Sequence, residues 1–153
     1  MMSAIMLKLP PPIWALAYVV IAYGLSRLAD GEPIPYFPAI PFAVVLIVAG
    51  VALSVSAALL FRREGTELNP ASPTNQKLVM SGPFRLTRNP MYLGLVLFTL
   101  GIAFWVGAWP MFLAPIATFA TVNWAHIPFE EASMRRQFSS DFEAYTRKAR
   151  RWI

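Results

Sequence analysis

A cluster of basic and polar residues, RLTRNPMYLGL at residues 85–95, stands directly before a long apolar run. Asn89 followed by Pro90 is typical of a helix start, because Asn is a favoured N-cap and Pro a favoured first helical residue. The free N–H groups of a helix start attract anions, and Arg88 adds a forked donor that suits a carboxylate. Tyr92 can stack on a ring or donate a hydrogen bond. An anion or cofactor site fits these residues, and a helix cap beside topology charges fits them equally well.

The second polar cluster is HIPFEE, which begins at His126. Pro128 lacks a backbone donor, so it should kink or end the apolar helix before it. Glu130 and Glu131 follow at once, and a hairpin of two spans would bring Arg88 and Glu130 within reach of one another. His126 precedes Glu130 by four residues and shares its face on a continuous helix. A plain salt bridge and a packed histidine would also account for this cluster.

The composition indicates a membrane protein. Of the 153 residues, 57% are hydrophobic and 14% charged, against about 45–50% and 25% in soluble domains. The chain has no cysteine, which excludes disulfides and a cysteine nucleophile. With the single histidine His126, an all-protein zinc site is improbable, so we expect no metal. The net charge of +5 suits anionic lipid better than nucleic acid.

Hydropathy predicts four transmembrane helices in a single domain that covers residues 1–153. The first two are residues 12–29 and 39–61. Residues 91–129 contain no Asp, Glu, Lys or Arg, and such a length must fold into two spans because one needs roughly 20 residues. The sequence WVGAWP predicts the turn between them, giving spans 91–108 and 109–129. Gly50, Ser54 and Ala58 form a small-residue stripe that predicts a helix–helix seam.

The distribution of charge predicts the orientation of these spans. All basic residues except Lys8 and Arg27 lie in the linker 62–89 and in the tail 130–153, which four spans place on the same side. By the positive-inside rule, both termini are cytoplasmic and the acidic loop around residue 31 lies outside. We therefore expect a multi-pass integral membrane protein, in the inner or plasma membrane if the source is bacterial.

The tail alternates apolar and basic residues at helical spacing. Phe138, Phe142 and Tyr145 recur on one face, and Ser140 with Glu143 forms a capping box at the start of a second tail helix. This pattern predicts an amphipathic helix at the membrane interface, which can also close a site from below. The expected fold class is thus all-α: four transmembrane helices and a C-terminal interfacial helix.

Three stretches together resemble the isoprenylcysteine carboxyl methyltransferase family, which is related to the membrane phospholipid methyltransferases. They are GTELNP, LVMSGPFRLTRNPMYLG and EEASMRRQFSSDFEAYTRKARRWI, which cover the second half of the chain in family order. That family transfers a methyl group from S-adenosylmethionine, bound at the cytoplasmic end of the helices. The resemblance implies the same cofactor here, with the cofactor-binding residues Gln76, Lys77, Leu78, Val79, Phe84, Asn89, Pro90, Met91, Tyr92 and Glu130.

Departures from the family pattern bear on the acceptor. His126 falls where the eukaryotic members carry an arginine tied to substrate and catalysis, and Asn89 replaces their histidine. Since an amine acceptor must first lose a proton, Glu131 or His126 is the nearest base. Arg88 suits the cofactor's carboxylate, and these three residues are the candidate catalytic set.

We therefore predict S-adenosylmethionine-dependent methyl transfer at the cytoplasmic membrane face. The acceptor is lipophilic or small: an isoprenylcysteine-like carboxylate, a lipid headgroup or a thiol. The alternatives are a small membrane scaffold or a transporter without chemistry. A transporter should place a charge or a broken helix near the bilayer midplane, whereas Asn123 and His126 lie near one end of their span.

Overall fold

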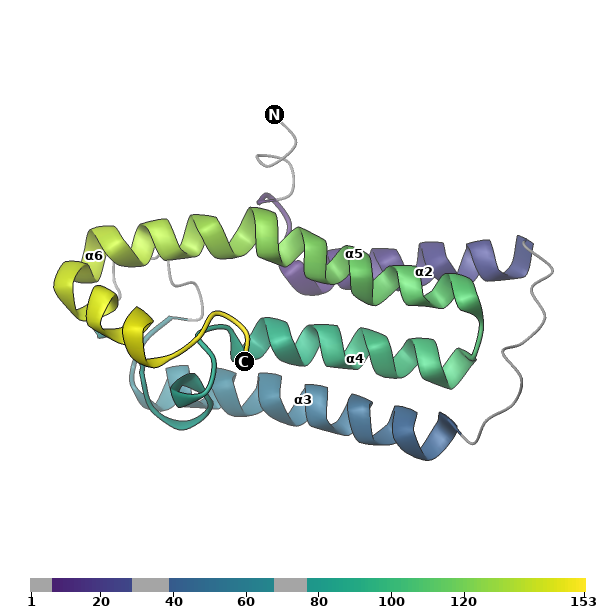
Figure 1. The fold of residues 1–153 in the computed structure, drawn as a ribbon, viewed down its shortest axis with the longest axis horizontal. Helices are drawn as coiled ribbons and strands as arrows, with labels where there is room; N and C mark the ends of the chain where they lie inside the picture. Colours follow the sequence, from purple (N-terminus) through teal and green to yellow (C-terminus); the bar gives the residue numbers. More distant parts are fainter. Residues whose placement is uncertain (1–6, 29–38, 68–76) are drawn as a thin grey trace.

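The computed structural model describes residues 7–28, 39–67 and 77–153, and these residues form an all-α bundle (Figure 1). The expected all-α class is thereby confirmed. The acidic loop and Gln76 lie outside the described residues. The main helices are α2 (Pro11–Leu28), α3 (Ala39–Arg63), α4 (Pro90–Val106), α5 (Leu113–Thr121) and α6 (Ile127–Lys148). Three short segments are η1 (Gly82–Arg85), η2 (Trp109–Phe112) and η3 (Val122–His126), the last of which is π-helical.

The first three predicted spans coincide with α2, α3 and α4 to within three residues. By length and apolar composition, α2 and α3 each qualify to cross a bilayer, and α4 is a shorter apolar helix of 17 residues. α4 starts at Pro90 and ends at Gly107, whose φ of 70° is the left-handed value that glycine adopts at helix ends. The predicted turn in WVGAWP is therefore present.

The fourth predicted span, residues 109–129, is longer and more complex than expected. η2, α5, η3 and the first part of α6 follow one another along a single rod, which continues past Pro128 as far as the break at Ser139 (Figure 1). Of the two alternatives for Pro128, the helix does not end there, and the irregular backbone lies just upstream in η3. The wide π turn of η3 finishes two residues before Pro128, so the backbone bond that proline cannot make falls where the α-helical ladder is already interrupted.

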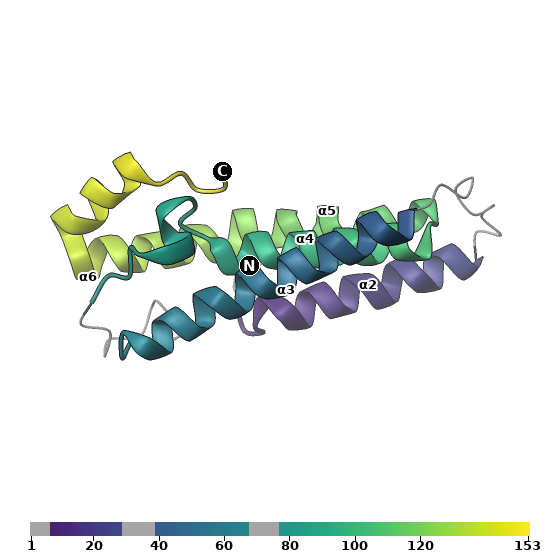
Figure 2. The same cartoon turned by 90° about the horizontal axis from the view of Figure 1, so that it is seen from below.

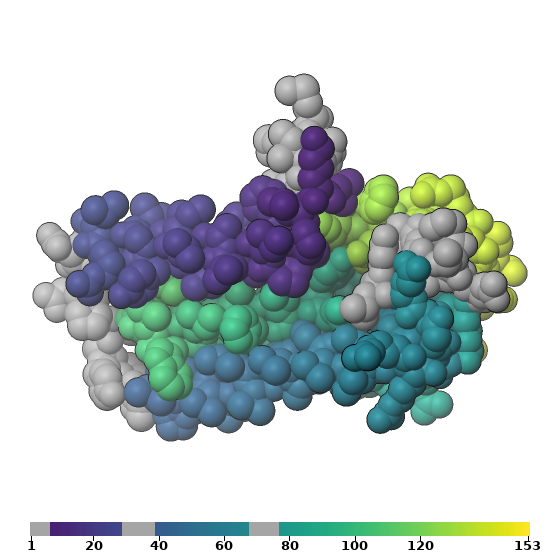
Figure 3. Space-filling view, turned by 180° about the vertical axis from the view of Figure 1, so that it is seen from behind, coloured from purple at the N-terminus to yellow at the C-terminus, as the bar shows by residue number. Residues whose placement is uncertain are grey.

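Helix α4 lies between the other helices (Figures 1 and 2). It packs along α3 on one side, while α2 packs mainly on α5. The view from behind shows α4 between α2 and α3 (Figure 3). Many large apolar side chains of α2 and α3 point outward, for example Leu16, Val20, Val45 and Val48, all more than 40% exposed, as a lipid environment allows.

The contact between α3 and α4 depends on two glycines. A Cβ on Gly50 would lie 2.5 Å from the carbonyl oxygen of Gly94 and 2.7 Å from the backbone nitrogen of Phe98. One turn further along α3, Ser54 donates a hydrogen bond to the carbonyl of Met91 at 3.2 Å. The predicted seam at Gly50 and Ser54 is therefore confirmed. It holds α4, including its first turn, against α3.

The tail helix breaks and folds back. Ser139, next to the predicted capping box, has φ 38° and ψ −110°, and beyond it the chain returns toward the start of α4 (Figure 1). Phe142 and Tyr145 are buried against Phe61 and Phe84, in one cluster. The apolar face of this helix therefore contacts the protein's own core, as expected for a tail helix that closes a site from below.

Gly50→Ala should weaken the bundle, because overpacking against backbone cannot be relieved by a side-chain rotation and costs about 1–3 kcal/mol. Thermal unfolding in detergent measures the effect. The matched control is Gly24→Ala on α2, where an added Cβ meets nothing within 4 Å. Equal melting temperatures for the two variants would contradict the close approach of α3 and α4.

Candidate functional site

One cavity of about 720 Å³ lies at the end of the bundle where α4 begins. Its wall is built from four parts of the chain: residues 7–12 at the start of α2, the last turns of α3, the stretch from residue 77 to the first turns of α4, and the segment from His126 through α6. Residues far apart in the sequence therefore converge on one cavity.

The cavity gathers the residues that the sequence singled out. Except for Gln76, which lies outside the described residues, every candidate lines it: Lys77, Leu78, Val79, Phe84, Arg88, Asn89, Pro90, Met91, Tyr92, His126, Glu130 and Glu131. The same wall contains residues that sequence reasoning did not assign, namely Leu7–Pro12, Ser54, Phe61, Leu95, Phe129, Met134, Phe138, Phe142 and Tyr145. The periodicity of the tail had marked the last three as one face, but it could not say what that face contacts.

Arg88 is held by the tail. Its Nη1 donates to the carbonyl oxygens of Ala149 at 2.6 Å and Thr146 at 3.3 Å, and its Nη2 donates to Glu131 at 2.9 Å. The Arg88 side chain is 13% exposed. The sequence suggested a pairing with Glu130, and the structure instead pairs Arg88 with Glu131. Since both terminal nitrogens are engaged, Arg88 fastens the tail to the start of α4.

Glu131 is buried, 6% exposed, between two arginines. Arg151 donates to it from Nε at 3.3 Å and from Nη2 at 2.8 Å, opposite Arg88. Burial alone would raise the pKa of this carboxyl, but the hydrogen bonds and charges of Arg151 and Arg88 outweigh it and lower the pKa. Its stabilising effect is therefore present above the ordinary carboxyl pKa and is lost as the pH falls through the lowered value. A carboxylate with a lowered pKa is a poor base at neutral pH.

Glu130 has the opposite environment. Tyr92 donates a hydrogen bond to its Oε1, and both residues line the cavity. Burial, together with the negative charge of the neighbouring Glu131, raises the pKa of Glu130 to about 7, although the bond from Tyr92 acts the other way. The pKa values of the two adjacent carboxyls are thus shifted in opposite directions, downward for Glu131 and upward for Glu130.

The start of α4 is sealed by the strap, which we define as residues 149–153. Asn89 occupies the N-cap position as predicted, but its side chain donates to the carbonyl of Arg151 at 2.9 Å and does not cap the helix. Thr87 donates to the same carbonyl at 3.1 Å, and the backbone N–H of Arg88 donates to that of Arg150 at 2.9 Å. A bridge between Thr87 and Arg150 completes this short parallel pairing.

The remaining walls combine an imidazole with aromatic rings. His126 is buried, with its ring 6.3 Å from that of Tyr92. Phe61, Phe84, Phe138 and Phe142 supply flat apolar surface, and the Tyr145 hydroxyl donates to the carbonyl of Phe84 at 2.6 Å. Lys77 stands at the rim, ion-paired with Glu64. Such a cavity suits an organic molecule that carries both an aromatic ring and a cationic group.

Comparison with known proteins gives a family match. The model of a family described as phospholipid methyltransferase matches residues 39–141. Two relatives from rice, Oryza sativa subsp. indica and subsp. japonica, are each described as a probable protein-S-isoprenylcysteine O-methyltransferase. Each is 25% identical over 143 residues, which is 89% of this chain and 72% of the relative. No solved structure matches.

Arg88→Met should release the tail, because it leaves the buried Glu131 with one arginine and removes the donors to Ala149 and Thr146. We expect a loss of about 2–4 kcal/mol in stability, since breaking a buried ion pair leaves an uncompensated charge. Limited trypsin digestion should then cut after Lys148 and Arg150 faster than in the wild type.

The control for this experiment is Arg135→Met, which removes an exposed ion pair with Glu143 at 3.3 Å and should cost under about 1 kcal/mol. If both variants resist trypsin like the wild type, Arg88 does not fasten the tail.

Proposed function

The chain belongs to the phospholipid methyltransferase family, whose members are membrane enzymes that use S-adenosylmethionine as methyl donor, and we propose that it transfers a methyl group from this cofactor to a lipophilic or small acceptor. The observation that carries the proposal is the cavity. The described cofactor residues that the resemblance implies come from the stretch before α4, from α4 itself and from α6, and they line one volume.

The chemistry of the lining supports S-adenosylmethionine as the occupant. A volume of about 720 Å³ lies within the roughly 300–1,000 Å³ typical of small-molecule sites. Glu130 offers a carboxylate to the cofactor's ammonium or ribose diol, with Tyr92 orienting it. The phenylalanines of the wall suit the adenine ring, and Lys77 at the rim suits the carboxylate. Because Arg88 is engaged with the tail, we assign it a positioning role and not direct contact with the carboxylate.

The bound cofactor supplies a methyl group made electrophilic by its sulfonium. The protein's part in an in-line displacement is to align the partners and exclude water, which the strap and the folded-back half of α6 accomplish by covering the start of α4. A carboxylate or thiolate acceptor needs no base. For an amine acceptor, Glu130 with a pKa near 7 or His126 is a better proton acceptor than Glu131, whose pKa is lowered.

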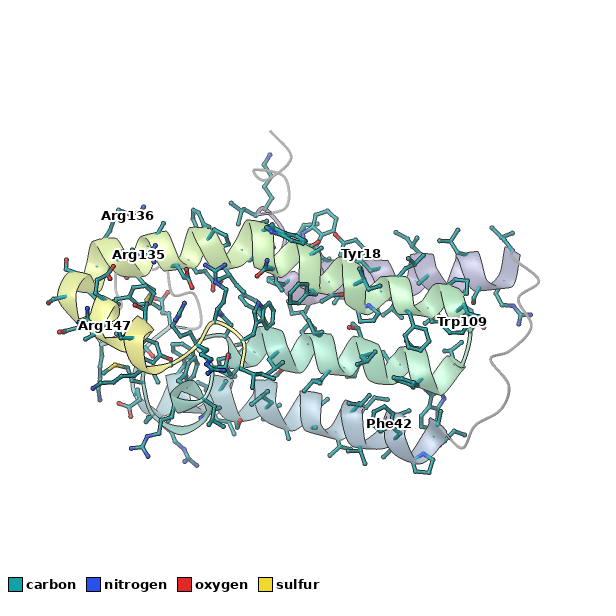
Figure 4. The ribbon with its side chains drawn as sticks, in the orientation of Figure 1. Tyr18, Phe42, Trp109, Arg135, Arg136 and Arg147 are labelled. Carbon is teal, nitrogen blue, oxygen red and sulfur yellow. The ribbon has the colours of Figure 1, made fainter. Side chains whose placement is uncertain are left out.

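We place the cavity at the cytoplasmic face of a four-span protein with both termini cytoplasmic. Two helices with the length and composition of spans, and a membrane family, support integration in the bilayer. The stick view supports the orientation: Arg135, Arg136 and Arg147 lie at the cavity end, while Phe42 and Trp109 lie at the opposite end (Figure 4). Arginines on the cytoplasmic side and an exposed tryptophan at the other interface are the pattern that membranes favour.

The acceptor is proposed as one of three classes: an isoprenylcysteine-like carboxylate, a lipid headgroup or a thiol. Apolar residues that precede α2, such as Leu7 and Leu9, line the same cavity as Glu130, and so does Leu95 of α4. This combination supports an acceptor with an apolar chain and a polar reacting end. The rice relatives carry a name that specifies an isoprenylcysteine acceptor, and the family name specifies a phospholipid.

Calorimetric titration of the detergent-purified protein should show micromolar binding of S-adenosylmethionine and S-adenosylhomocysteine, lost in Glu130→Ala and retained in Arg136→Ala. Radiolabelled cofactor should then transfer its methyl group to one of three probes: phosphatidylethanolamine vesicles, a farnesylated N-acetylcysteine or an alkanethiol. A folded wild-type protein that binds neither nucleoside would overturn the proposal and favour a membrane scaffold without chemistry.

Affinity for S-adenosylhomocysteine should rise with pH between pH 6 and 8. Because the pKa of Glu130 is raised to about 7, its carboxylate, the form that attracts the ligand's ammonium, becomes dominant across this interval. The limiting slope is about tenfold in affinity per pH unit below the pKa. Titrations of Glu130→Gln should be weaker and nearly independent of pH, with Glu143→Gln as the exposed control. A wild-type slope retained in Glu130→Gln would show that another group titrates.

A further inference from the structure

We propose that the strap positions the π-helical segment η3, and through it His126, with Trp152 and Asn123 as the positioning pair. The inference rests on the proposed function, because it concerns the same cavity. Neither Trp152 nor Asn123 lines that cavity, so the two residues act through others and are not catalytic.

The strap joins two opposite walls of the cavity. At one end, the carbonyl of Arg151 accepts hydrogen bonds from Thr87 and Asn89, next to the cofactor residues at the start of α4. The Arg151 side chain meanwhile pairs with Glu131, beside Glu130. The backbone at Arg151 is therefore held by the elements that form the proposed cofactor site.

The next residue reaches the segment that carries His126. Trp152 Nε1 donates to Asn123 Oδ1 at 3.1 Å, and its ring packs on that of Phe119 with centroids 4.8 Å apart. Asn123 and His126 both belong to η3. Adjacent residues of the strap thus bind the cofactor side and η3, so a displacement of one is transmitted to the other.

A π turn needs such support. Its extra residue widens the helix and costs regular backbone bonding, and these turns persist mostly at functional sites, where other contacts stabilise them. Here the turn directs His126 into the cavity, 5% exposed, two residues before Pro128 in the first turn of α6. The hydrogen bond from Trp152 is accepted by Asn123, a side chain of the π turn itself. Without this bond we expect His126 to move relative to Tyr92 and Glu130.

The single histidine provides a direct readout. The Cε1–H resonance of His126 is the only imidazole signal of the chain, and its chemical shift at fixed pH reports the surroundings of the ring. Trp152→Phe keeps an aromatic ring on Phe119 and removes the N–H donor, while Asn123→Ala removes the acceptor. We expect both variants to shift this signal, and the double variant to add little, because the two changes remove one hydrogen bond.

The matched control is Trp124→Phe, the same substitution next to Asn123 at a side chain that is 70% exposed. It should leave the His126 signal near its wild-type position. If all three single variants leave the signal unchanged, or shift it equally, the strap does not position His126.

Kinetics separate positioning from folding and from the proposed function. With the acceptor probe that the wild type methylates, Trp152→Phe and Asn123→Ala should lower kcat by about tenfold or more through misplacement, while calorimetric affinity for S-adenosylhomocysteine stays within error. Wild-type kcat in both variants would overturn the inference and leave the proposed function intact. Absence of nucleoside binding by the wild type would instead defeat the proposed function, and the His126 signal would still test the strap.

Discussion

The closed form of the site depends on the buried carboxylate of Glu131. A buried anion is costly unless charges and donors surround it, and here Arg88 and Arg151 do so from opposite sides. Arg88 belongs to the segment before α4, Arg151 to the strap and Glu131 to α6, so the ion pairs join these three parts of the chain. If this carboxylate were neutral, both ion pairs would be lost, and the tail would be held by the hydrogen bonds that its carbonyls accept from Arg88, Thr87 and Asn89.

The contrast between the adjacent glutamates follows from the same arrangement. Arg88 and Arg151 both donate hydrogen bonds to Glu131. Glu130 faces the cavity, and within the described part of the chain it accepts a hydrogen bond from the hydroxyl of Tyr92. Burial and the neighbouring anion then raise its pKa toward neutrality. Two consecutive residues of one helix thus provide one carboxylate that pairs with arginines and one carboxyl that faces the cavity.

Local signals predicted the helices well and the long-range contacts poorly. Asn89–Pro90, Gly107 and the charge-free runs marked the limits of α3 and α4 because caps and hydropathy depend on neighbouring residues. Motif resemblance identified the cavity residues, but not their partners. Arg88 was expected to serve a ligand or Glu130. Its engagement by the carbonyls of Thr146 and Ala149 follows from a chain reversal at Ser139, whose place the capping box at Ser140 marked but whose direction no local pattern encodes. The π turn was likewise hidden, since Pro128 indicated a disruption without indicating that the helix would absorb it.

The position of the strap in the sequence has a consequence for biosynthesis. Residues 149–153 follow every helix in the chain, yet they supply the carbonyls that cover the start of α4 and the arginine that neutralises Glu131. During synthesis, α2 to α5 emerge while this end of the bundle is still open and Glu131 lacks one of its two partners. A chain stalled before residue 151 therefore has its apolar helices but lacks the carbonyl that Thr87 and Asn89 bind and the guanidinium that pairs with Glu131.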